Sequence, residues 1–262
     1  MATNLRHKEI LMILEQHGSV SIRELTRQLY VSEATVRRDL AELEKAGALK
    51  RTHGGAKSVL ETSKQVPLFI REALDSKAKS EICRQAAALV KEGDTIFIDG
   101  SSTAQYLVKY IASIKDIAVV TYSIKTAELM CQSHIKTYCA GGLMIENSLV
   151  CTGNKTVEFA KSINTDVCFI SCKGVSDDGK FTDTSEEETA VRRAFMQNAR
   201  QVALLMTQNK FGATYMHTLA DLAEIDFLFS DGEIPPAIQA RIQKEETQSF
   251  FENACKQSEN LA

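Results

Sequence analysis

A chain of 262 residues, 44% hydrophobic and 25% charged, has the composition of a folded globular protein, which excludes a largely disordered chain. No apolar run is long enough to cross a membrane and the N-terminus lacks an apolar signal-peptide core, so we expect a cytoplasmic protein with no membrane partner. The net charge of −3 is uneven: residues 1–57 hold ten Lys/Arg and seven Asp/Glu, which favours a nucleic-acid partner for this segment alone.

The first 57 residues carry the signals of three short helices followed by a hairpin. Apolar positions recur at helical spacing, Ser21 and Glu24 form a capping box, and Ser32 stands at a second cap position. A Gly-Gly pair that follows a short strand-like run is typical of a tight turn between strands. We therefore predict helices over 4–16, 22–29 and 32–46, a strand over 49–52, and a hairpin at Gly54-Gly55.

Beyond residue 77, short apolar runs alternate with helical stretches. The runs are TIFID (95–99), IAVVT (117–121), IKTYC (135–139), VCFIS (167–171), VALLM (202–206) and DFLFS (226–230). Helical spacing falls between them, over 77–91, 101–112, 123–132, 155–163 and 186–199. This alternation predicts an α/β fold with a mostly parallel sheet that is covered on both faces.

These changes in pattern divide the chain into four segments. We predict a winged helix-turn-helix domain over 1–57, a linker with Pro67 over 58–76, an α/β domain over 77–232, and a C-terminal helix and tail over 233–262. The final helix begins after Pro235-Pro236, with Ile238 and Ile242 inward. Seven cysteines are scattered singly without a CxxC pair, so we expect free thiols, no metal site and no cofactor.

The third predicted helix has two contrasting faces. Its apolar residues gather on one side of a helical wheel: Val36, Leu40 and Leu43. The opposite side carries Ala34, Thr35, Arg37 and Arg38. An arginine bridges O6 and N7 of guanine, and the N-terminus of a helix favours phosphate, so this face suits the major groove of DNA.

Taken alone, Arg37-Arg38 is more simply a solvated surface pair beside Asp39 and Glu42. Two features favour DNA binding instead: the pair lies on the third of three short helices, and a hairpin follows. That hairpin carries Lys50, Arg51 and His53, which are placed to reach the flanking backbone as the wing of a winged helix does.

Small and polar residues follow the carboxyl ends of the predicted strands of the α/β domain. The first such turn is Asp99-Gly100-Ser101-Ser102-Thr103, which offers hydroxyls and backbone N–H groups to a phosphate. The candidates at later strand ends and at the next helix are Thr121, Tyr122, Ser123, Gly141, Gly142, Lys173, Glu188 and Lys210. Each is also explained singly as a helix cap, a turn or an exposed charge. Because ligands of parallel sheets bind at this edge, together they predict an anion pocket.

The stretch SIRELTRQLYVSEATVRRDLAELEKAGALKRTHGGA resembles the DNA-binding domain of the DeoR family of sugar-metabolism regulators. It matches the family signature V-S-x-x-T-[IV]-R-R-D-[IL] followed by R-x-H-G-G. The resemblance implies that Ser32, Thr35, Arg37 and Arg38 face DNA. It also implies a C-terminal domain similar to ribose-5-phosphate isomerase that binds a phosphorylated sugar. In that domain the Asp99–Thr103 turn resembles the family's D-x-G-T-T phosphate loop, and Asn209–Gly212 its S-K-F-G.

The chain also departs from the family pattern. Tyr122 stands where the family has Asn, Lys173 where Asp is common, and Thr207 where a strand usually ends in Asp. The effector therefore cannot be transferred from a relative, and the S-C-x-G variant resembles the fucose-operon regulators of the family.

Three functions are compatible with these residues. The first is a repressor of a carbohydrate operon that binds double-stranded operator DNA as a homodimer or homotetramer and responds to a phosphorylated sugar. The second is an isomerase with Glu188 as its base, which the loss of acidic residues at Lys173 and Thr207 disfavours. The third is a DNA-binding protein whose larger domain only oligomerises, which the hydroxyls and lysines at the strand ends disfavour. We expect the first, and no enzymatic activity.

Overall fold

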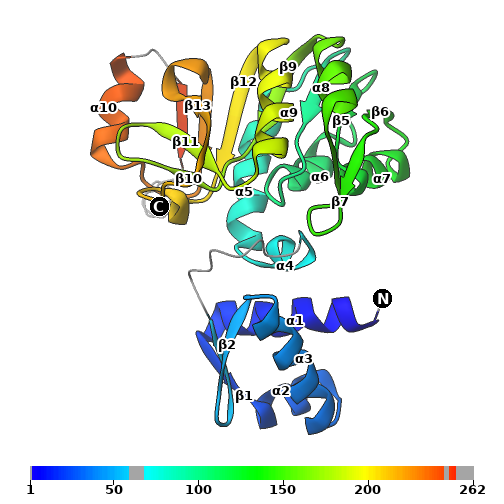
Figure 1. Ribbon diagram of the computed structural model, residues 1–262, viewed down its shortest axis with the longest axis vertical. Helices are drawn as coiled ribbons and strands as arrows, with labels where there is room; N and C mark the ends of the chain where they lie inside the picture. The colour runs from blue at the N-terminus through cyan, green and yellow to red at the C-terminus, as the bar shows by residue number, and fades with distance from the viewer. Residues whose placement is uncertain (1, 59–67, 245–247, 252–262) are drawn as a thin grey trace, which may run out of the picture. The chain divides into compact units, whose positions relative to one another are not determined.

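The computed structural model describes residues 2–58, 68–244 and 248–251. Pro67, Cys255 and the end of the predicted tail lie outside the described residues. The chain forms two compact units, Met1–Ser76 and Lys77–Ala262 (Figure 1). None of the helices in the described residues combines the length and hydropathy that a membrane crossing requires.

The first unit is a helix-turn-helix with a three-stranded antiparallel sheet in the order β1-β3-β2. Its helices are α1 (Ala2–His17), α2 (Ile22–Leu29), α3 (Glu33–Lys45) and α4 (Leu68–Ala73), and its strands are β1 (Ser19–Ser21), β2 (Leu49–Thr52) and β3 (Gly55–Ser58). The predicted capping box is confirmed, since Ser21 accepts from the Glu24 N–H and the Glu24 carboxylate accepts from the Ser21 N–H. The strands β2 and β3 form the wing.

The helix α4 lies within the segment that was predicted to be a linker. Leu68, Ile70 and Ala73 are buried, and Ile70 and Ala73 join the core of the first unit with Ile10, Leu25 and Leu40. The apolar residues of this short helix are too few to show a period in the sequence. Their burial in the core of the first unit is what makes the segment helical.

Among the described residues of the second unit, seven strands form one sheet in the order β15-β14-β12-β9-β4-β5-β6, and neighbouring strands in it run parallel. The strands are β4 (Thr95–Ile98), β5 (Ala118–Thr121), β6 (Lys136–Cys139), β9 (Thr165–Ile170), β12 (Ala199–Met206), β14 (Phe227–Ser230) and β15 (Gln248–Phe251). The first six correspond to the six predicted strands. β15 was not predicted, and it lies in the segment expected to be a tail.

Both faces of this sheet are buried, as the continuous apolar runs predicted. Phe97, Cys168 and Leu204 belong to one core cluster, and their neighbours Phe169 and Leu205 belong to the cluster on the other face. The helices of the unit are α5 (Ser76–Ala86), α6 (Val108–Ile111), α7 (Ile124–Gln132), α8 (Asn154–Lys161), α9 (Glu186–Gln197) and α10 (Pro236–Lys244). Residues of α5, α6 and α7 join the second cluster, whereas residues of α8, α9 and α10 join the first. The fold class is confirmed.

Several short elements were not predicted from the sequence. They are the 3-10 turns η1 (Ala87–Leu89), η2 (Ala104–Leu107), η3 (Gln208–Lys210) and η4 (Leu222–Glu224), the hairpin of β7 (Leu143–Ile145) and β8 (Val150–Thr152), and the sheet of β10 (Gly174–Val175), β11 (Lys180–Asp183) and β13 (His217–Asp221). The helix predicted over 101–112 is in fact η2 followed by the short α6. Elements of two to five residues carry too little periodicity to be recognised before the chain is folded.

Candidate functional site

The exposed face of α3 carries the side chains that were predicted to meet DNA. Arg37 and Arg38 are exposed, Ala34 is exposed beside them, and Thr35 is half-buried. Ser32 accepts a hydrogen bond from the Thr35 N–H at 3.2 Å, and the two hydroxyl oxygens lie 2.9 Å apart. Ser32 therefore caps the N-terminus of α3, the end of a helix that favours phosphate.

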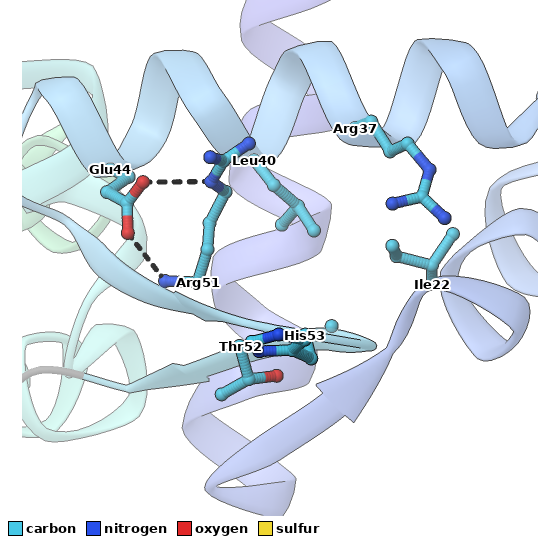
Figure 2. A pocket seen from close by; sticks show the side chains of 8 residues that line it. Ile22, Arg37, Leu40, Glu44, Arg51, Thr52 and His53 are labelled. Carbon is cyan, nitrogen blue, oxygen red and sulfur yellow. Dashed lines mark hydrogen bonds and ion pairs between the residues drawn. The ribbon is translucent and has the colours of Figure 1, made fainter.

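A groove runs between α3 and the wing (Figure 2). Its volume is about 390 Å³ and its walls are Ile22, Arg37, Leu40, Glu44, Arg51, Thr52, His53 and Gly55. The structure thus brings together Arg37, Arg51 and His53 from two different elements. Lys50, on the same strand as Arg51, does not line this groove.

Glu44 fixes the wing to α3, a role that sequence reasoning missed. Its carboxylate accepts the Arg51 backbone N–H at 2.8 Å and the Arg51 Nε–H at 2.8 Å. The hydrogen bond from the Arg51 backbone and the nearby guanidinium hold the pKa of Glu44 below its ordinary value. The two residues are seven positions apart, a spacing that has no signature in the sequence once a turn intervenes.

A buried ion-pair cluster holds α3 on α1. Asp39 is buried and accepts hydrogen bonds from Nε and Nη2 of Arg6, the latter at 2.8 Å. Nε2 of the buried His7 lies 3.3 Å from Asp39 and 3.5 Å from Glu42. The ligand atoms of His7, Asp39 and Glu42 lie within 4.8 Å of one another, a spacing that a metal ion would accept. Arg6 already occupies both oxygens of Asp39, so the cluster fits an anchor between helices better.

In the second unit the predicted effector residues gather at the carboxyl edge of the central strands. Asp99, directly after β4, is fully buried and accepts hydrogen bonds from the backbone N–H of Ser101 and of Ser171, both at 2.9 Å. Burial raises the pKa of this carboxyl group, and the charge of Arg192 opposes that effect. Asp99 therefore ties the turn after β4 to the end of β9.

Lys210 reaches the same edge from the turn after β12. Its Nζ donates to Oγ of Ser171 at 2.9 Å, and this hydroxyl donates to the Leu205 carbonyl at 2.6 Å. Burial raises the pKa of the neighbouring Cys172 thiol to about 11, so the thiol stays protonated at neutral pH. All six cysteines that the structure describes are free thiols.

Sequence reasoning missed two buried charges of this edge, Arg192 and Asp183. Nη2 of Arg192 lies 3.0 Å from Asp183, its Nη1 donates to the Ser171 carbonyl at 2.7 Å, and its Nε donates to the Glu188 carbonyl at 3.3 Å. Burial raises the pKa of Asp183, but the charge and hydrogen bond of Arg192 and the hydrogen bond from the Thr184 N–H together lower it by more, so the net shift is downward. Arg192 follows Glu188 by one helical turn on α9, which was the one available signal.

The remaining predicted residues differ in how accessible they are. Ser101, Lys173, Glu188 and Lys210 are half-buried, and Gly141 and Gly142 are exposed. Ser102, Thr103, Thr121, Tyr122 and Ser123 are buried. Thr121 donates to the Ile98 carbonyl at 2.7 Å and Ser123 caps α7, so these two hydroxyls already serve the fold.

Comparison with known proteins covers both units. Residues 6–62 match the model of the DeoR-like helix-turn-helix domain, and residues 74–232 match that of the DeoR C terminal sensor domain. The HTH-type transcriptional regulator GolR of Listeria innocua is 31% identical over 91% of this chain and 94% of its own length. The L-fucose operon activator of Haemophilus influenzae is 30% identical over 90% and 95%. For the glycerol-3-phosphate regulon repressor of Escherichia coli the identity is 28%, over 91% and 94%.

Among solved structures, ribose 5-phosphate isomerase A of Neisseria gonorrhoeae superposes with a TM-score of 0.40 and 13% identity, over 55% of each chain. A likeness of this size carries no argument about function. The relatives that cover nine-tenths of the chain are named as transcriptional regulators.

Proposed function

This chain belongs to the DeoR family of transcriptional regulators, and we propose that it represses a carbohydrate operon by binding operator DNA under the control of a phosphorylated sugar. The observation that carries the DNA-binding half is the exposed Arg37-Arg38 face of α3 beside the wing. The residues we assign to DNA are Ser32, Thr35, Arg37, Arg38, Lys50, Arg51 and His53. A recognition helix in the major groove with a flanking wing is the docking geometry that this arrangement fits.

We place the effector at the carboxyl edge of the main sheet in the second unit. The residues we assign to it are Asp99, Gly100, Ser101, Ser102, Thr103, Thr121, Tyr122, Ser123, Gly141, Gly142, Lys173, Glu188 and Lys210. Two relatives are named for glycerol-3-phosphate and L-fucose, which supports a small phosphorylated polyol or sugar. The half-buried Lys210, bonded to Ser171, whose N–H in turn binds Asp99 of the hydroxyl-rich turn, supports a phosphate, and Glu188 supports a sugar hydroxyl.

The working unit in this proposal is a homodimer or homotetramer. One small head contacts few base pairs, so two heads on a pseudo-palindromic operator supply the affinity that a repressor needs. Effector binding then shifts the population toward an arrangement whose two recognition helices no longer match the two half-sites.

The DNA-binding half is tested by mobility shift of the full-length protein on promoter fragments from its own genome, with and without a panel of sugar phosphates. We expect at least one fragment to be bound in preference to the others and one sugar phosphate to change its affinity. A protein that prefers no fragment under any condition would contradict the proposal.

The effector half is tested by thermal denaturation with the same panel, because a specific ligand stabilises the state that it binds. We expect one compound to raise the midpoint, and Ser101→Ala and Lys210→Met to reduce that shift while leaving operator affinity within about twofold of wild type. A flat response across the panel would favour a second unit that only oligomerises. Turnover of any compound would instead favour an enzyme.

A further inference from the structure

Of two neighbouring arginines on α3, Arg37 lines the groove between α3 and the wing and Arg38 does not. Arg37, Leu40 and Glu44 follow one another at three and four residues, so they form the stripe of α3 that faces the wing. Arg38 is about 100° further round the helix and does not line the groove. The stripe that Arg38 shares, at the same spacing, is Ala34, Arg38, Ala41 and Lys45. The side chain of Arg37 therefore lies at the groove beside the wing, whereas that of Arg38 lies on another face of α3.

We propose that the two arginines divide the work of DNA recognition, a proposal that rests on the proposed function. Arg37 and Arg51 hold one sugar-phosphate strand in the groove between α3 and the wing, and Arg38 reads base edges in the major groove. When a helix enters the major groove and a wing lies outside it, one backbone strand has to pass between them. The groove of about 390 Å³ is the space that this strand occupies.

The neighbours of Arg38 support base reading. Ala34, one turn before Arg38, is exposed, and Ala41, nearly one turn after it, is half-buried. A small methyl group on each side of an arginine lets the helix backbone approach the floor of the DNA major groove, where a guanidinium reaches O6 and N7 of guanine. Among the described residues no carboxylate forms an ion pair with Arg38, so its guanidinium gives up no such bond when it binds a base.

The neighbours of Arg37 and Arg51 support phosphate binding. Nη2 of Arg37 lies 3.6 Å from the exposed carboxylate of Glu33, a pair that contributes little in water and that a phosphate can displace. Glu44 holds Arg51 by Nε and by its backbone N–H, and no hydrogen bond from another described residue occupies the two terminal nitrogens of the guanidinium, which a phosphate can accept from. Figure 2 shows Arg37 and Arg51 on either side of Leu40, with Thr52 and His53 on the hairpin below.

The test compares lysine with alanine at each arginine. A lysine keeps the charge that a phosphate needs and loses the planar fork that reads guanine. Full-length wild type is first used to select its preferred duplex from a random-sequence library. Affinities for that duplex and for a shuffled one are then measured over a range of salt for Arg37→Ala, Arg37→Lys, Arg51→Ala, Arg51→Lys, Arg38→Ala and Arg38→Lys.

For Arg37→Ala and Arg51→Ala we expect similar losses on both duplexes, so the ratio of the two affinities stays within about twofold, and the slope of log K against log salt falls by about 1. Lysine at either position restores the slope. For Arg38→Ala and Arg38→Lys alike we expect the ratio to fall by about tenfold, because the bidentate contact to a base is lost in both.

If Arg37→Ala lowers the ratio as much as Arg38→Ala, or if Arg38→Lys keeps the wild-type ratio, the division of work is wrong while DNA binding itself stands. A wild-type protein that selects no sequence from the library removes the proposed function and this inference together.

Discussion

Two adjacent glycines in the hairpin of the first unit have different surroundings. A Cβ at Gly55 would lie 2.8 Å from Cα of Ser21 and closer still to the carbonyl oxygen of Val20, because β3 pairs with β1 at this point. A Cβ at Gly54 would meet no atom of the described residues within 4 Å. The pair looks symmetrical in the sequence, but only Gly55 is required by packing.

We predict that Gly55→Ala destabilises the first unit by about 3 kcal/mol, since backbone atoms of β1 cannot move aside as a side chain would. Gly54→Ala is the matched control, with an expected change below about 0.5 kcal/mol. Denaturant unfolding followed by circular dichroism measures both. Equal effects of the two substitutions would show that the close approach of β3 to β1 does not limit this site.

Asp39 and Glu42 form a second informative pair at the scale of residues. Asp39→Asn removes a buried carboxylate from Arg6 and His7, and we expect a loss of about 2 kcal/mol in unfolding free energy and weaker DNA binding. Glu42 is exposed, so Glu42→Gln should change stability by less than about 0.5 kcal/mol. Chemical denaturation of the two variants side by side decides the point, and a larger loss for Glu42→Gln would refute the anchor.

At the scale of elements, one ion pair joins β11 to α9 at the edge where we place the effector. Burial raises the pKa of Asp183, but Arg192 and the hydrogen bond from the Thr184 N–H together lower it below its ordinary value. A carboxyl group whose folded-state pKa lies below its unfolded value of about 3.9 stabilises the protein above that value. This stabilisation is lost as the pH falls through the folded-state pKa.

We therefore predict that Asp183→Asn lowers the stability of the second unit by about 3 to 5 kcal/mol at pH 7, because it leaves Arg192 buried without its partner. The loss relative to wild type should begin to shrink below about pH 3.9, where the unfolded chain protonates Asp183, and shrink until the pH has passed the lower pKa of the folded state. Thermal melts of both proteins between pH 7 and pH 3 measure the difference. A difference that does not depend on pH would contradict the role assigned to the ion pair.

At the scale of the whole molecule, each unit has a core of its own. Ile10, Leu25 and Leu40 belong to the core of the first unit, while Phe97 and Phe169 belong to the two clusters that cover the sheet of the second. Because each unit has a core of its own, we expect each to unfold in its own cooperative transition.

We predict two transitions when the full chain is heated in a calorimeter. Leu40→Ala removes buried methyl groups from the first core and should lower the midpoint of only one transition. The expected loss in the unfolding free energy of the first unit is about 2 to 5 kcal/mol at 25 °C. Phe97→Leu should lower only the midpoint of the other transition. A single transition that both substitutions move would show that the two units unfold together.

Local patterns in the sequence determined much of this protein. The capping box at Ser21, the cap at Ser32 and the strands β4, β9 and β12 were predictable because their signals lie within a few residues. The family was predictable from the residues around Arg37 and Arg38, because they form one continuous stretch. The mostly parallel sheet followed from the alternation of runs.

The tertiary structure alone decided which side chains meet. Glu44 with Arg51, Lys210 with Ser171 and Asp183 with Arg192 come from different elements, the second pair 39 positions apart. Such contacts depend on how the elements are ordered and aligned in the fold, and the hydrophobic periodicity of a single element determines neither. The same holds for α4 and for the groove beside Arg37, which exist only because apolar surfaces distant in the chain are buried against one another.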